Sequence, residues 1–98
     1  MTPEELAQSA MKDDQPPLDL TPPARVLWLA KAGEWHEAHE DCQTMQDEKA
    51  GAWIHAWLHR EEGDYGNACY WYNRADKSPK PQDYPLEEEW AEIAKELI

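Results

Sequence analysis

The stretch WIHAWLHREEGDYGNACYWYNRA, residues 53–75, decides the fold of this chain. It contains three of the six tryptophans and three of the four tyrosines. Apolar residues recur every three or four positions on both sides of the Gly63-Asp64 pair, and this period is that of an α-helix with one buried face. Glycine next to aspartate is typical of a tight turn. We therefore expect a helical hairpin over residues 52–76.

A second, weaker copy of the same pattern precedes this stretch. Gly33-Glu34-Trp35 aligns with Gly63-Asp64-Tyr65, and small or apolar residues follow at equal offsets in both copies: Ala38 and Ala68, Cys42 and Tyr72, Met45 and Ala75. Such internal repetition indicates stacked copies of one supersecondary unit. The sequence thus predicts a first helical hairpin over residues 22–46.

The remaining segments predict caps on these two hairpins. Residues 1–20 indicate a short helix followed by a proline-rich extended linker, and 86–98 have the spacing of a C-terminal helix. No strand pattern occurs, so residues 21–98 are expected to form one all-α domain. Its predicted core is Leu27, Trp28, Trp35, Cys42, Trp53, Ile54, Trp57, Leu58, Tyr72, Trp90 and Ile93.

Two resemblances accompany this pattern. The segment G-D-Y-x-x-A-x-x-x-Y-x-x-A, at residues 63–75, resembles the second half of a tetratricopeptide repeat. This resemblance implies stacked helical hairpins and, for the function, peptide binding. The motifs AHE, at 38–40, and HAWLHREEGD, at 55–64, are similar to those of a group of small bacterial helical proteins of unassigned function. That resemblance implies no particular activity.

The charge of the chain indicates which classes of molecule are disfavoured as its binding partner. With 21 acidic residues and nine basic ones, the net charge is -12. Nucleic acids and anionic membranes are disfavoured as partners, because both require a basic surface. Two cysteines are too few for a disulfide framework, and no signal peptide or spanning segment is predicted. We expect a cytoplasmic protein whose partner is a protein, a peptide or a second copy of the chain.

The histidines are the main candidates for chemistry. His55 and His59 are four residues apart on one helix, and His39 lies on the preceding helix, whose antiparallel packing brings it level with them. Three imidazoles, with Glu37 or Glu40 nearby, suit zinc or another transition metal. The other interpretation is a hydrogen-bonded seam between two helices without any cofactor. The histidines of WHEAHE, at positions 36 and 39, are three residues apart, whereas those of the H-E-x-x-H motif of metalloproteases are four apart.

The aromatic run Tyr70-Trp71-Tyr72 suggests a second kind of site. Three consecutive residues span most of a helix's circumference, so at least one of these rings must face solvent or a partner. Tyr70 and Trp71 are therefore candidate partner-binding residues. Arg60 is expected to form a surface or interhelical ion pair with Glu61 or Glu62. No catalytic residues are predicted, and a non-enzymatic protein-interaction module is the favoured function. The alternative is a metal-binding or metal-dependent hydrolytic protein.

Overall fold

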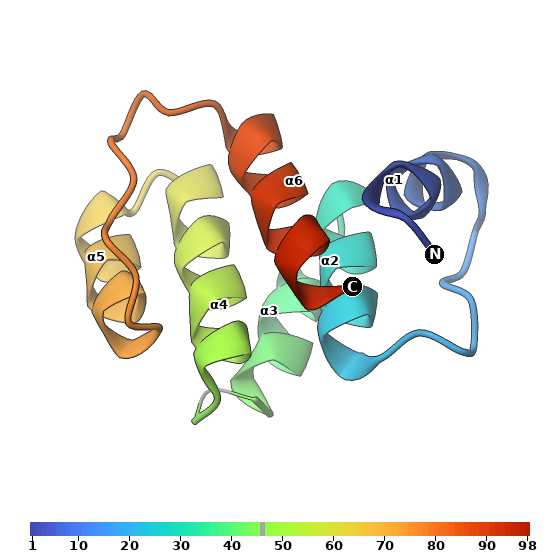
Figure 1. Ribbon diagram of the computed structural model, residues 1–98, viewed down its shortest axis with the longest axis horizontal. Helices are drawn as coiled ribbons and strands as arrows, with labels where there is room; N and C mark the ends of the chain where they lie inside the picture. Colours follow the sequence, from blue (N-terminus) through green and yellow to red (C-terminus); the bar gives the residue numbers. More distant parts are fainter. Residues whose placement is uncertain (46) are drawn as a thin grey trace.

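A computed structural model describes residues 1–45 and 47–98 of the chain. Over these residues the protein consists of helices without any strand (Figure 1). The six helices are α1 (Pro3–Lys12), α2 (Pro22–Lys31), α3 (Trp35–Gln43), α4 (Lys49–Glu61), α5 (Tyr65–Arg74) and α6 (Leu86–Leu97). The prediction of an all-α fold with helical hairpins is confirmed. The predicted end of the first hairpin, residue 46, lies outside the described residues.

The first two helices begin as their sequences indicate. The hydroxyl of Thr2 accepts the backbone N–H of Glu5, and the Glu5 side chain accepts the backbone N–H of Thr2 in return. Thr21 accepts the N–H of Ala24 in the same manner, and a proline follows each threonine. These caps satisfy backbone N–H groups that have no partner within the first turn of a helix.

The α2–α3 and α4–α5 turns have the same backbone geometry. Gly33 has φ = 86° and Gly63 has φ = 87°, in the left-handed region that only glycine adopts freely. The residue after each glycine donates its N–H to the carbonyl five residues earlier, at 2.9 Å in the first turn and 2.8 Å in the second. The expectation that the two hairpins are equivalent at their turns is confirmed.

An aromatic ring closes each hairpin at the residue where its second helix begins. Trp35 and Tyr65 occupy this position, and both rings are half-buried. The Trp35 Nε1–H donates to the Leu58 carbonyl at 2.8 Å, while the Tyr65 hydroxyl donates to the Lys80 carbonyl at 2.6 Å. The first ring thus bonds to the next helix, and the second bonds to the loop that follows the last hairpin.

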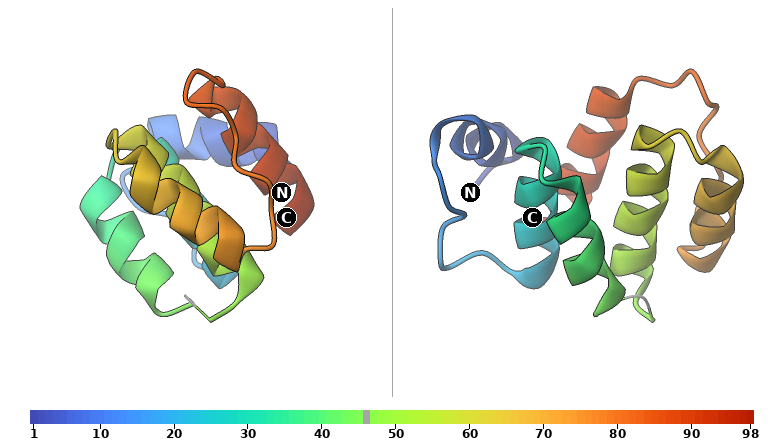
Figure 2. Two further views of the ribbon diagram at one scale, coloured as in Figure 1. Left: turned by 90° about the vertical axis from the view of Figure 1, so that its left-hand side faces the viewer. Right: turned by 180° about the vertical axis from the view of Figure 1, so that it is seen from behind.

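Helix α4 is the centre of the fold. It contacts α2, α3, α5 and α6, and every residue from 51 to 60 is buried (Figures 1 and 2). A Cβ atom on Gly51 would lie 2.2 Å from the Met45 carbonyl oxygen, so glycine permits the close approach there. The helix starts at Lys49, three residues before the predicted start. The prediction missed these residues because Lys49, Ala50 and Gly51 carry no large apolar side chain that would extend the apolar period.

Helix α6 packs across the first helices of both hairpins. It contacts α2 and α4, and Figure 1 shows it lying over these two helices. Two tryptophans secure this crossing: Trp57 Nε1–H donates to the Leu86 carbonyl at 2.8 Å, and Trp90 Nε1–H donates to the Leu27 carbonyl at 3.0 Å. The predicted core residues are buried, except Trp35, which is half-buried.

A buried ion pair joins α4 to α6 through Arg60 and Glu89. The pair is interhelical, as one of the two predicted alternatives had it, but the predicted partners Glu61 and Glu62 and the surface alternative are wrong. Arg60 Nη1 lies 2.6 Å from Glu89 Oε1, and the Glu89 side chain is 0% exposed. Tyr72 and Trp53 also donate to this carboxylate, at 2.6 Å and 3.1 Å. A buried charge is tolerated only when it is paired and fully hydrogen-bonded. These four side chains, the Glu89 network, meet that condition.

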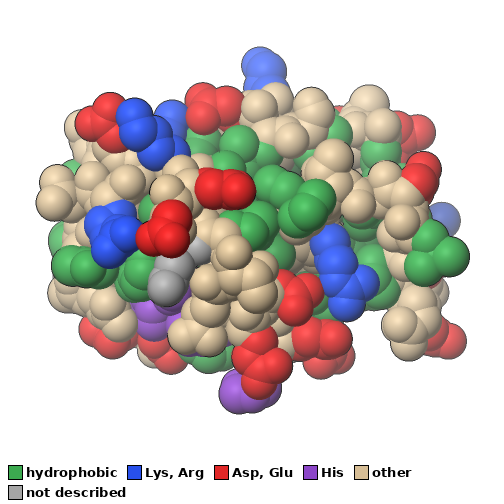
Figure 3. All heavy atoms as spheres, turned by 90° about the horizontal axis from the view of Figure 1, so that it is seen from below, with side chains coloured by type: hydrophobic (Ala, Val, Ile, Leu, Met, Phe, Trp, Pro, Cys, Tyr) green, Lys and Arg blue, Asp and Glu red, His purple; other side chains and the backbone are tan. Residues whose placement is uncertain are grey.

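The surface mixes charged and apolar side chains. Seen from below, acidic and basic groups are interspersed with apolar side chains, and histidine atoms show along the lower edge near acidic groups (Figure 3). No helix in the described part of the chain combines the length and the apolar character needed to cross a bilayer.

Candidate functional site

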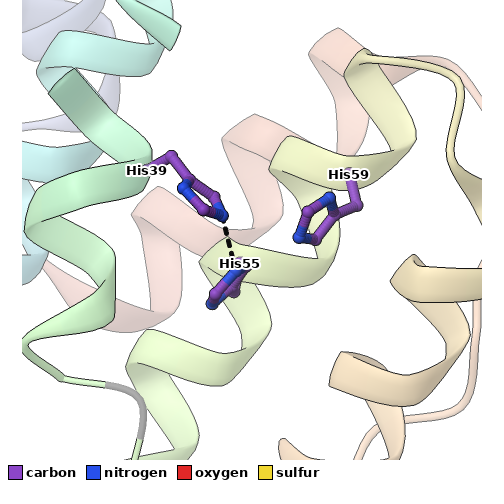
Figure 4. A group of neighbouring side chains, drawn as sticks. All are labelled: His39, His55 and His59. Atoms are coloured by element: carbon purple, nitrogen blue, oxygen red, sulfur yellow. Dashed lines mark hydrogen bonds between the residues drawn. The ribbon is translucent and has the colours of Figure 1, made fainter. Parts of the chain in front are cut away.

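Three histidines converge where α3 and α4 pack together (Figure 4). His39 comes from α3, and His55 and His59 come from successive turns of α4. Each ring offers one nitrogen such that all three nitrogens lie within 4.8 Å of one another. The fourth histidine, His36, is exposed on α3 and pairs with Glu40 at 2.8 Å, away from this group. We refer to His39, His55 and His59 as the histidine cluster.

The closest contact in the histidine cluster joins two ring nitrogens. His39 Nε2 lies 3.0 Å from His55 Nε2, and the two rings meet nearly edge-on at 88°. One of these nitrogens must carry the proton for this contact to be a hydrogen bond. Two nitrogens bound to one tetrahedral zinc ion, each about 2.05 Å from the metal, lie about 3.3 Å apart. The observed separation is therefore close to that of two ligands on one ion.

The third imidazole is oriented by a carboxylate. His59 Nδ1 lies 2.6 Å from Glu62 Oε1, so the carboxylate accepts the Nδ1 proton and leaves the lone pair on Nε2. Figure 4 shows one ring nitrogen of His59 facing the other two histidines. The Asn67 amide lies 3.4 Å from Nε2 and donates towards it. A carboxylate behind a ligating histidine is the usual outer partner in metal sites.

His55 is the most deeply buried ring of the three. Its exposure is 2%, and no described residue bonds to its Nδ1. Trp71 stacks on it with ring centres 3.9 Å apart. Burial, with the neighbouring His39 and His59, lowers the pKa of His55 to about 3. This ring is therefore neutral at pH 7, which is the form that binds metals.

His39 is half-buried and stacks on Trp35, with ring centres 4.8 Å apart. Burial, followed by the charge of His59, lowers its pKa below the usual value for histidine. The partial exposure of this ring leaves one side of the histidine cluster within reach of solvent. His39 is thus both a candidate ligand and the member of the cluster that solvent reaches.

The carboxylate that bonds to the histidine cluster is not one of those that the sequence suggested. Glu37 and Glu40 were expected near the histidines, but Glu37 lies 3.8 Å from Arg25, and Glu40 pairs with His36. Glu62 supplies the nearby carboxylate instead. Glu62 stands three residues after His59, at the end of the same helix, and side chains at this spacing can meet. This spacing is the sequence feature that indicates the contact. Asn67 has no such signal, because it joins the group across the α4–α5 turn.

The thiol closest to the site in sequence takes no part in it. Cys42 is fully buried, and its Sγ donates to the Gly51 carbonyl at 2.9 Å. Burial raises the pKa of Cys42 to about 12, so the group stays a neutral thiol. The metal-binding form of cysteine is the thiolate. The histidine cluster is therefore a nitrogen-donor site.

The two candidate partner-binding residues have different environments. Tyr70 is 53% exposed, and its hydroxyl accepts a hydrogen bond from Arg74 at 3.2 Å. Trp71 is half-buried because one face of its ring covers His55. Tyr70 is thus the freer of the two rings, while Trp71 belongs to the wall of the histidine cluster.

Comparison of the chain with protein-family models, with curated proteins and with solved structures finds no match.

Proposed function

We propose that this protein binds one divalent transition-metal ion of the zinc class through His39, His55 and His59. The observation that supports it most is the 3.0 Å separation between His39 Nε2 and His55 Nε2, together with a third nitrogen within 4.8 Å. Two nitrogens bound to one zinc ion lie about 3.3 Å apart. The side chains reach this separation with small shifts, of at most about 1.5 Å at His59.

The chemistry of the donors favours a particular class of ion. Imidazole nitrogen suits zinc, copper, nickel and cobalt, whereas magnesium and calcium require oxygen ligands. The rings of His39 and His55 are held in their neutral forms by burial, so protons compete weakly with a metal there. The net charge of -12 adds a general attraction for cations.

The competing interpretation is a seam of hydrogen bonds without a metal. In that case the buried polar atoms should be paired with one another. The three rings share one mutual hydrogen bond, His59 bonds to Glu62 and Asn67 outside the cluster, and His55 Nδ1 has no partner among the described residues. The metal interpretation rests on the convergence of the three ring nitrogens and not on this Nδ1 atom, which an ion bound at Nε2 would also leave unbonded.

Calorimetric titration of zinc chloride into untagged, chelator-treated protein tests the proposal. We expect one ion per chain and a higher melting temperature in the zinc-loaded protein. H39Q changes the half-buried ligand and should weaken binding at least tenfold, while H36Q, on the exposed side of α3, should bind like the wild type. Absence of stoichiometric binding by the folded wild-type protein, or equal binding by H39Q, contradicts the proposal.

A second candidate function is that of a non-enzymatic protein-interaction module. The observation that favours it is the large exposed ring of Tyr70 on α5, with Arg74 at 3.2 Å. Helix α6 packs over α2 and α4, so the outer side of α5 is the more accessible surface for a protein, a peptide or a second copy of the chain. Light scattering of the wild type and Y70A tests self-association: a dimer should dissociate in Y70A.

The proposal also includes a fold relationship and a cellular location. A relationship of the hairpins to tetratricopeptide repeats is supported by the matching glycine turns at Gly33 and Gly63. A cytoplasmic location is supported by the two free cysteines, Cys42 and Cys69, which suit a reducing compartment.

A further inference from the structure

We propose that an ion bound by the histidine cluster keeps one coordination position open beside Asn67, and that a water molecule or a small anion occupies it. This inference rests on the proposed metal site and deepens it by naming the ligand that the ion would exchange with solvent.

The number of converging donors supports an open position. Among the described residues, the group that includes His39 and His55 contains three donors, all imidazoles. Structural zinc sites use four protein ligands, whereas catalytic zinc sites use three and leave the fourth position to water or substrate. Cys42, the thiol closest to the site in sequence, is occupied by its hydrogen bond to the Gly51 carbonyl. The cluster therefore has the ligand count of an open site.

Glu62 does not supply the missing ligand. Its Oε1 bonds to His59 Nδ1 at 2.6 Å, and in an imidazole Nδ1 lies on the opposite side of Cε1 from Nε2. The carboxylate thus fixes the tautomer of His59 and aims its Nε2 lone pair, the role of an outer-sphere partner. It leaves the inner coordination sphere with three protein nitrogens.

Asn67 lies next to the lone pair that the ion would use. Its amide nitrogen is 3.4 Å from His59 Nε2, and the residue is exposed on the first turn of α5. Once an ion takes this lone pair, the amide loses its acceptor but remains within a few ångströms of the metal. An amide N–H in that position donates to an oxygen or nitrogen atom bound at the fourth position. The partial exposure of His39 gives small molecules access to the same region.

Loading the protein with cobalt in place of zinc allows the fourth coordination position to be followed by absorption spectroscopy. The d–d absorption of Co²⁺ reports a change of ligand, so the cobalt-loaded protein is titrated with sodium azide. In the N67D variant the carboxylate replaces the amide and is placed to become the fourth protein ligand. N73D introduces the same change at an exposed position later in α5 and serves as the matched control.

We expect azide to change the spectrum of cobalt-loaded wild type and N73D along a saturable curve. N67D should bind Co²⁺ at least as tightly as the wild type and lose at least about tenfold in azide affinity. An unchanged spectrum of the cobalt-loaded wild type would overturn the open position while leaving the metal site intact. An azide response in N67D equal to that of the wild type would contradict the placement of the open coordination position beside Asn67. Failure of the wild type to bind Co²⁺ or Zn²⁺ would remove both proposals.

Discussion

The two helical hairpins share a backbone pattern but differ in what lies between their helices. Residues 33–45 and 63–75 follow the same order of buried, half-buried and exposed positions. In the first hairpin, Arg25 on α2 donates to Asp41 on α3 at 3.1 Å, and both are partly exposed. The equivalent positions of the second hairpin hold His55 and Trp71, stacked at 3.9 Å. A surface ion pair in one copy is thus replaced by a buried imidazole in the other.

The difference between the two hairpins explains why the histidine cluster occurs once in this fold. His59 occupies the position of Leu29 in the first hairpin, so a buried aliphatic side chain is replaced by a second buried imidazole. Helix α4 also has a neighbour on each side, and α3 contributes His39 from the first hairpin. The histidine cluster therefore forms only where the second copy packs against the first.

The largest expected difference concerns Cys42 and Tyr72, which occupy equivalent buried positions. Tyr72→Ala removes a large ring and its hydrogen bonds to Glu89, and should lower the free energy of unfolding by about 4 kcal/mol. Cys42→Ala removes one sulfur atom and should cost about 1 kcal/mol. Urea denaturation followed by tryptophan fluorescence measures both. Equal losses in the two variants would contradict the unequal roles assigned to the two hairpins.

The stability of the protein should depend on pH because of His55. Its folded-state pKa of about 3 lies below the unfolded value of about 6.5, so the unfolded chain binds more protons between these values. The stability of the metal-free protein should be fullest above pH 6.5 and fall by about 2 kcal/mol between pH 7 and pH 5. His39 shifts in the same direction. Urea denaturation at both pH values measures the loss, and H55Q should reduce it.

The smallest effect is expected at the ion pair of the first hairpin. Asp41→Asn removes the charge that Arg25 contacts at 3.1 Å, but both side chains are partly exposed. Exposed pairs contribute little because water and salt screen them, so the free energy of unfolding should change by less than about 1 kcal/mol. Thermal unfolding at low and high salt provides the measurement. A larger loss would show that the first hairpin also depends on a polar contact between its helices.

The predictable part of the molecule depends on local signals. Apolar periodicity and the Gly33 and Gly63 turns give the helices and both hairpins, because these features act within a few residues of the chain. The approach of His39 to His55 and His59 followed from spacing, since antiparallel helices joined by a short turn have a restricted register.

What the sequence did not reveal depends on contacts distant along the chain. Glu89 stands in a run of three glutamates that look alike in the sequence, and only the crossing of α6 over α4 buries it against Arg60. Asn67 likewise joins the histidine cluster through the packing of α5 on α4. Such partners are set by tertiary placement, which local periodicity does not encode.

X-ray absorption at the zinc K-edge of the zinc-loaded protein tests the central claim most directly. We expect a first shell containing three imidazole nitrogens at about 2.0 Å, with the outer-ring scattering that identifies histidine. The H39Q variant should lose one imidazole from that shell, and H36Q should retain all three. A first shell of oxygen atoms alone, or a spectrum unchanged by H39Q, would contradict the assignment of His39, His55 and His59 as the metal ligands.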